Sequence, residues 1–82
     1  MTVEVLYFAA VRDLVGKGEE RLTLPEGVRT LADLVAHIQS VHPELLGRLT
    51  GVRFAIDEEF ANLDAALHPD AVVAVIPPVA GG

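Results

Sequence analysis

Two stretches of the chain are apolar at nearly every position, and they lie at opposite ends. Residues 2–8 read Thr-Val-Glu-Val-Leu-Tyr-Phe, and residues 71–76 read Ala-Val-Val-Ala-Val-Ile. β-Branched and aromatic side chains at this density are typical of β-strands. Because both alternating faces of each stretch are largely apolar, we expect two central strands that need cover on both faces of the sheet.

One longer helix is predicted at residues 30–42. Thr30 stands at the N-cap position and Asp33 follows three residues later, as in a capping box. His42 precedes a proline, which disfavours helical geometry and ends the helix there. Apolar side chains recur at i, i+3, i+4 and i+7 and predict a single core-facing stripe, formed by Leu31, Leu34, Val35 and Ile38.

Shorter elements fill the rest of the chain. The pattern predicts two further helical turns, at 9–15 (ended by Gly16) and at 44–49. It predicts three further strands, at 19–24, 52–56 and, as a short edge strand, 59–62. The connections are turns at 25–27 and 57–58, a turn or 3₁₀ loop at 64–67 and a connector at 68–70. The order predicts an α+β domain with a mixed sheet of four to five strands, one main helix and short helical turns.

This element list leaves one face of the sheet without an obvious neighbour. Two strands that are apolar on both faces need cover on each side, yet only one long helix is predicted. Either the short helical segments cover the second face, or a patch of it stays exposed for a partner. The sequence leaves both alternatives open.

Size and composition narrow the class of protein. Eighty-two residues indicate one domain, which we place at 1–76, followed by a flexible tail at 77–82. A net charge of −6 argues against nucleic acid binding and suits a basic protein partner, although a merely solvated surface is as common. The chain has no long apolar run and no basic leader, so we expect no membrane association and a cytoplasmic location.

Cysteine chemistry and metal binding are not expected. The chain has no cysteine, which excludes disulfides, a thiol nucleophile and thiolate zinc sites. His37 and His42 should not share a helix face, and His68 falls in a turn, so we predict no metal site. No phosphate-binding loop or catalytic triad is present in the pattern, and we expect the chain itself to bind no cofactor.

The sequence closes on Pro77-Pro78-Val79-Ala80-Gly81-Gly82. Prolines lack an N–H donor and favour the end of a strand, whereas consecutive glycines make a thin thread that could enter a narrow tunnel. Six extended residues reach about 20 Å. We therefore expect a tail that presents its carboxylate to another protein's active site; the alternative is an ordinary frayed end.

Both ends also carry a family resemblance. The segment Val5-Leu6-Tyr7-Phe8-Ala9-Ala10-Val11-Arg12-Asp13-Leu14-Val15-Gly16 resembles the opening, and Ile76-Pro77-Pro78-Val79-Ala80-Gly81-Gly82 the ending, of the small subunit of molybdopterin synthase, the MoaD family. The element order agrees with the ubiquitin-like β-grasp fold of that family. Two positions depart from it: Val75-Ile76 replace paired aromatics, and Asp57 stands where an Asn-centred turn is common.

The resemblance implies a protein-borne sulfur donor within a heterotetrameric synthase. It implies that an ATP-dependent activating enzyme adenylates the Gly82 carboxylate and that sulfide displaces AMP to leave a thiocarboxylate. The tail, Pro77 to Gly81, then enters the large catalytic subunit, where the sulfur builds the dithiolene of molybdopterin. On this view ATP binds the activating enzyme, and the chain is no enzyme on its own.

Single residues suggest further contacts with a partner, and the same tail chemistry allows other functions. Phe8, Arg12, Phe60 and Ile76 are candidate contacts, whereas Phe54 on its alternating strand is expected in the core. A carrier for thiamine or tRNA thiolation shares the same acyl-adenylate, as does a ubiquitin-like modifier of lysines. A plain interaction domain whose tail has no chemistry is a third class.

Overall fold

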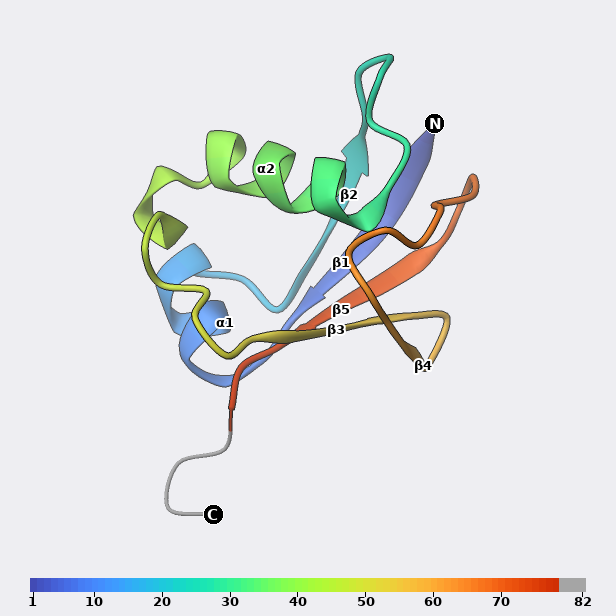
Figure 1. The fold of residues 1–82 in the computed structure, drawn as a ribbon. Helices are drawn as coiled ribbons and strands as arrows, with labels where there is room; N and C mark the ends of the chain where they lie inside the picture. The colour runs from blue at the N-terminus through green and yellow to red at the C-terminus, as the bar shows by residue number, and fades with distance from the viewer. Residues whose placement is uncertain (79–82) are drawn as a thin grey trace.

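The computed structural model describes residues 1–78 and forms a single mixed sheet with its helices on one side (Figure 1). The strand order is β2-β1-β5-β3-β4. The two doubly apolar strands, β1 (Thr2–Tyr7) and β5 (Val72–Ile76), run parallel at its centre, with Val5 opposite Val73. This confirms the prediction of two central strands.

The remaining elements match the predicted order. The antiparallel strands are β2 (Glu19–Thr23) beside β1, β3 (Arg53–Ile56) beside β5, and the edge strand β4 (Glu59–Ala61) beside β3. The helices are α1 (Ala9–Val15), α2 (Leu31–Val41) and the single 3₁₀ turn η1 (Pro43–Leu45). Residues 64–67, expected as a turn or 3₁₀ loop, contain a turn and a β-bridge between Ala66 and Thr30.

The start of α2 is capped as predicted. The Asp33 N–H donates to the Thr30 hydroxyl at 3.2 Å, and the Thr30 N–H donates back to the Asp33 carboxylate at 3.1 Å. The next free donors, on Leu31 and Ala32, reach the carbonyls of Ala65 and Leu63. All four N-terminal N–H groups of the helix are therefore satisfied within the protein.

The hydrophobic core lies between α2 and the sheet. Leu31, Leu34 and Ile38 are at most 2% exposed, whereas Val35, predicted on the same stripe, is only half-buried at its margin. From the sheet, one alternating set of side chains points into this core: Val3, Val5, Tyr7, Phe54, Val73 and Val75. The core placement of Phe54 is confirmed.

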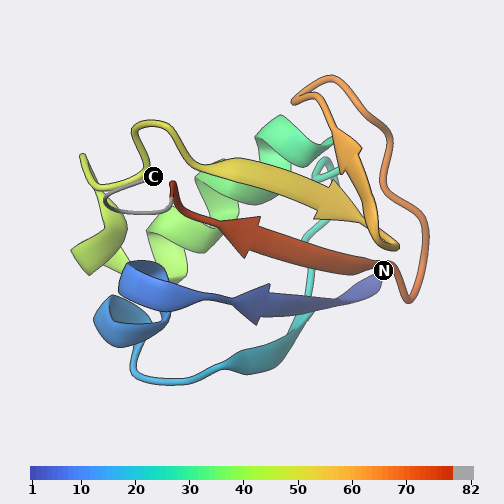
Figure 2. The same cartoon turned by 90° about the horizontal axis from the view of Figure 1, so that it is seen from below.

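The short helices do not cover the second face of the sheet. Val11 of α1 and Leu45 of η1 are almost fully buried in the same core as α2. Figure 2, seen from below, shows the strands in front and α2 behind them, with α1 at the end of the sheet. The first alternative for the cover of the sheet is therefore wrong: within residues 1–78, no element covers the second face.

Candidate functional site

The open face of the sheet is a shallow apolar hollow. One cross-strand row runs Leu6, Ala74, Ala55, Phe60 across β1, β5, β3 and β4. The two alanines in the middle leave room between larger side chains on either side, which produces a hollow of about 480 Å³. We call the residues that line it the open face: Leu6, Phe8, Ala55, Asp57, Glu58, Phe60, Val72, Ala74 and Ile76.

Large apolar side chains on this face are unusually exposed. Phe8 is 45% exposed, Phe60 is 61% exposed and Val72 is 36% exposed. Folding leaves part of each side chain in water, so a partner that covered them would gain the hydrophobic free energy of burying the remaining surface. Phe8, Phe60 and Ile76 were all predicted as partner contacts, and the structure brings them to one surface.

Phe60 is held in place by a cation. The Arg53 guanidinium lies 3.8 Å from the centre of the Phe60 ring, a stacking distance typical of a cation–π contact. Because an aromatic ring with a fixed orientation loses little entropy on binding, this stack prepares Phe60 for a partner.

The far end of the open face is acidic. Asp57 and Glu58 form the β3–β4 turn, both with positive φ (50° and 71°). Asp57 accepts from the Val72 N–H at 3.0 Å and pairs with His68 Nε2 at 2.5 Å. The Val72 N–H and the His68 ring lower the pKa of Asp57, and the Asp57 carboxylate and the Pro69 carbonyl raise the pKa of His68.

At its other end the open face meets the root of the tail. Phe8, Ala9, Ile76 and Pro77 enclose a second apolar hollow of about 260 Å³ where β5 ends. Ile76 pairs with Arg53 as the last residue of the ladder, and Pro77 and Pro78 follow. The predicted tail residues Val79, Ala80, Gly81 and Gly82 lie outside the described residues.

Arg12 sits on the exposed side of α1, four residues after Phe8. Its side chain lies against Gly18, where an added Cβ would be 3.4 Å from the Arg12 Nε. It is not among the residues that line the open face or the hollow beside Pro77. Its proposed contact with a partner stays a prediction.

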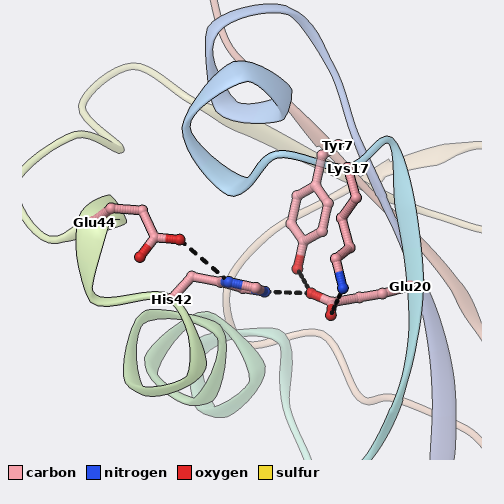
Figure 3. Close-up of polar contacts among 5 residues, drawn as sticks. All are labelled: Tyr7, Lys17, Glu20, His42 and Glu44. Atoms are coloured by element: carbon pink, nitrogen blue, oxygen red, sulfur yellow. Dashed lines mark hydrogen bonds and ion pairs between the residues drawn. The ribbon is translucent and has the colours of Figure 1, made fainter.

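A polar cluster that the sequence did not suggest lies beneath α1, on the covered side (Figure 3). The Tyr7 hydroxyl donates to Glu20 Oε2 at 2.5 Å, and His42 Nε2 lies 2.5 Å from the same oxygen. Lys17 Nζ is 3.6 Å from Glu20 Oε1, and Glu44 is 3.3 Å from His42 Nδ1. The cluster therefore connects β1 and β2 to the end of α2 and to η1.

The electrostatics of this cluster favour an ionised glutamate. Burial pushes the pKa of Glu20 upward, but hydrogen bonds from Tyr7 and His42 outweigh it and lower that pKa. Burial and the neighbouring Glu20 carboxylate raise the pKa of Tyr7. Its contacts join β1 and β2 to the end of α2 and to η1, which is how the cluster contributes to the fold.

Two further kinds of site are absent from the described part of the chain. Within residues 1–78 no group of three histidine, cysteine or acidic side chains is placed to hold a metal ion. No helix of the same range has the length and apolar character needed to cross a membrane.

Sequence reasoning found the large side chains of the open face and missed its small ones. Ala55 and Ala74 create the hollow, but an alanine in a strand carries no signal of its own. The available signal was indirect: β5 is apolar on both faces, and Ala74 lies on the face opposite Val73 and Val75. The Tyr7–Glu20–His42 cluster was missed because its members lie 13 and 22 residues apart.

Comparison with known proteins identifies the family of the chain. A family model described as the ThiS family matches residues 5–82. The molybdopterin synthase sulfur carrier subunit of Chlamydomonas reinhardtii is 37% identical over 84 residues, covering 100% of both chains. This relative confirms the resemblance to the small subunit of molybdopterin synthase.

Solved structures show the same fold. The small archaeal modifier protein 1 of Haloferax volcanii matches with a TM-score of 0.85 at 23% identity, over 95% of this chain and 98% of that one. In the complex of subunits 1 and 2 of molybdopterin-converting factor from Helicobacter pylori, one chain matches with a TM-score of 0.71 at 25% identity, each chain covered fully. The family match over nearly the whole sequence shows that this protein belongs to the ThiS family, with a ubiquitin-like β-grasp fold.

Proposed function

We propose that the protein is the sulfur-carrier subunit of a molybdopterin synthase, with the sulfur carried on the Gly82 carboxylate. One observation carries the proposal: an uncovered apolar face of the sheet runs directly to the root of the tail at Ile76 and Pro77. A partner that docks on this face therefore receives the chain end. A relative named as a molybdopterin synthase sulfur carrier subunit supports the choice of pathway.

The chemistry begins with activation of the chain end. A carboxylate is a poor acyl donor because its leaving group would be oxide, whereas the acyl-adenylate formed with ATP releases AMP. The terminal sulfur of a persulfide attacks the carbonyl carbon and the C–O bond to AMP breaks, which gives an acyl disulfide. A second thiol then cleaves the S–S bond, so that Gly82 is left as a thiocarboxylate and the two thiol sulfurs form a disulfide. An ATP-dependent activating enzyme supplies the nucleotide site for this step, in the cytoplasm where ATP is available.

The second step takes place on the large subunit. In this proposal it covers the open face, receives the tail from Pro77 to Gly81 in a tunnel and supplies the catalytic groups for dithiolene formation. The contribution of this chain is affinity and placement: Phe8, Phe60 and Ile76 anchor the complex, and glycine at the end fits a narrow passage. The match to one chain of the Helicobacter pylori two-subunit complex supports this division.

Mass spectrometry of the intact protein tests the proposal. After incubation with the activating enzyme, ATP and a sulfur source, one C-terminal oxygen should be exchanged for sulfur. The matched control is Gly82→Ala, which should keep its fold but transfer sulfur more slowly to the large subunit, because a methyl group crowds the tunnel. No exchange with a competent activating enzyme would falsify the proposal.

Two rival functions share the acyl-adenylate and need separate readouts. Gene deletion distinguishes the acceptor pathway: loss of molybdoenzyme activity supports the proposal, and a thiamine or tRNA-thiolation defect supports another carrier role. A denaturing gel tests the modifier role. A ladder of conjugates that disappears when Gly82 is deleted would replace the carrier by a ubiquitin-like modifier.

A further inference from the structure

The segment between α2 and β3 runs beside the root of the tail. Its first residue, His42, is tied to Glu20, and Leu45 of η1 is fully buried in the core. Two backbone hydrogen bonds then form turns within the segment: the Arg48 N–H donates to the Leu45 carbonyl, and the Val52 N–H donates to the Leu49 carbonyl. The segment is therefore anchored at its start and folded on itself up to β3.

Gly51 is the residue of this segment that lies beside Pro78. A Cβ placed at Gly51 would lie 3.5 Å from Cγ and 3.9 Å from Cδ of Pro78, so a larger side chain would meet the proline ring. Pro78 has no N–H with which to continue the ladder beyond the Arg53–Ile76 pair. Beyond this pair, the Pro78 ring lies beside the bare backbone of Gly51.

We propose that Gly51 is a positioning residue for sulfur transfer. By presenting bare backbone to Pro78, it determines where the chain leaves the domain and hence the direction from which the tail starts toward the partner. This inference rests on the proposed function, since it concerns delivery of the chain end after docking. Geometry matters here because a displacement of about 1 Å at a reacting group can cost about 100-fold in rate.

A simpler explanation for glycine at this position is its backbone conformation. Gly51 has φ +77°, a left-handed geometry that favours glycine without any role for Pro78. The same segment contains a matched control: Gly47 has φ +76°, and an added Cβ there would meet nothing within 4 Å. Equivalent substitutions at the two positions therefore share the backbone cost and differ in the contact with Pro78.

The experiment compares Gly51→Asn with Gly47→Asn in the full chain. Asparagine tolerates left-handed geometry, so both variants should fold with similar melting temperatures. After thiocarboxylate loading, we expect Gly51→Asn to slow single-turnover sulfur transfer to the large subunit about tenfold, with Kd for that subunit changed less than twofold. Gly47→Asn should transfer at the wild-type rate.

A double mutant gives a readout that a purely structural role would not change. Pro78→Ala removes the ring that the new side chain would meet, so Gly51→Asn should slow transfer much less in a Pro78→Ala background than in the wild type. Equal rates for the two asparagine variants, or a Gly51 effect of the same size in both backgrounds, would overturn the positioning role. Wild-type protein that accepts no sulfur in the same assay would instead refute the proposed function.

Discussion

The two faces of the central strands have similar side chains and different surroundings. On the covered face, Val5 and Val73 are fully buried under α2. On the open face of the same strands, Leu6, Ala74 and Ile76 are only half-buried and form a hollow. The hydropathy of the side chains does not distinguish the two faces. They differ because the helices of the chain pack against only one of them. An apolar face left open in so small a domain indicates a surface kept for a partner.

Most residues with a strained backbone lie on the open side of the sheet. Of the four non-glycine residues with positive φ in the described chain, Ala9, Asp57 and Glu58 line hollows on the open side. Such conformations cost about 1–3 kcal/mol each and persist where the surrounding structure imposes them. Two of these residues lie in the turn at the end of the open face, and Ala9 lies in the neighbouring hollow beside Pro77.

The largest effect on stability is expected from a substitution in the core under the covered face. Leu34→Ala should lower the free energy of unfolding by about 2–5 kcal/mol, because Leu34 is fully buried and its truncation leaves a cavity. Leu6→Ala, the matched change on the open face, should cost about 1 kcal/mol. Urea denaturation of both variants measures the difference, and similar losses would erase the distinction between the faces.

This contrast explains which parts of the fold were predictable. The periodicity of Leu31, Leu34 and Ile38 and the Thr30–Asp33 capping box are local patterns, and they located α2 closely. Pro43 and Gly16 ended the helices for equally local reasons. Local steric and hydrogen-bonding rules therefore account for the elements and for their order.

The site was predictable only in part because it depends on tertiary placement. Alternation showed that β1 and β5 were apolar on both faces, but no local rule decided whether the short helices would cover the second one. Their core residues, Val11 and Leu45, could have faced either side of the sheet. The Tyr7–Glu20–His42 cluster depends on packing between three elements and had no sequence signature.

The next effect concerns binding and tests the open face directly. Phe60→Ala should weaken association with the large subunit by about 2 kcal/mol, roughly 30-fold in Kd, while changing the free energy of unfolding by less than about 1 kcal/mol. Leu46→Ala is the control: Leu46 is also 61% exposed but lies off the open face. Titration calorimetry should show no loss for Leu46→Ala, and equal losses would remove the special role of the face.

A smaller effect is expected at the edge of the covered face, where the Tyr7 hydroxyl donates a hydrogen bond to Glu20. At pH 7 Glu20→Gln should lower the free energy of unfolding by about 1 kcal/mol, because a charged hydrogen-bond acceptor is lost. The folded-state pKa of Glu20 is lowered, so its stabilisation is present above the ordinary glutamate pKa of about 4.3 and is lost as pH falls through the folded value.

The pH profile provides the check on this cluster. The stability gap between wild type and Glu20→Gln should narrow as pH falls through the lowered folded-state pKa of Glu20. Glu19→Gln, on the exposed neighbour in the same strand, should show a smaller gap at every pH. A gap that persists unchanged into acid would mean that the hydrogen bonds of Glu20 do not depend on its charge.

The smallest effect has an unusual sign and probes strain on the open side. Ala9 has φ 49°, where a Cβ is unfavourable, so Ala9→Gly should raise the free energy of unfolding by about 0.5 kcal/mol after the greater unfolded-state entropy of glycine is included. Ala10→Gly, one residue further into α1, should lower it by about 1 kcal/mol, because glycine is a poor helix former. Thermal melts of the two variants test whether the backbone at Ala9 is strained. If both substitutions destabilise the protein, the backbone at Ala9 carries no strain. Strain near the open face would then be confined to the β3–β4 turn.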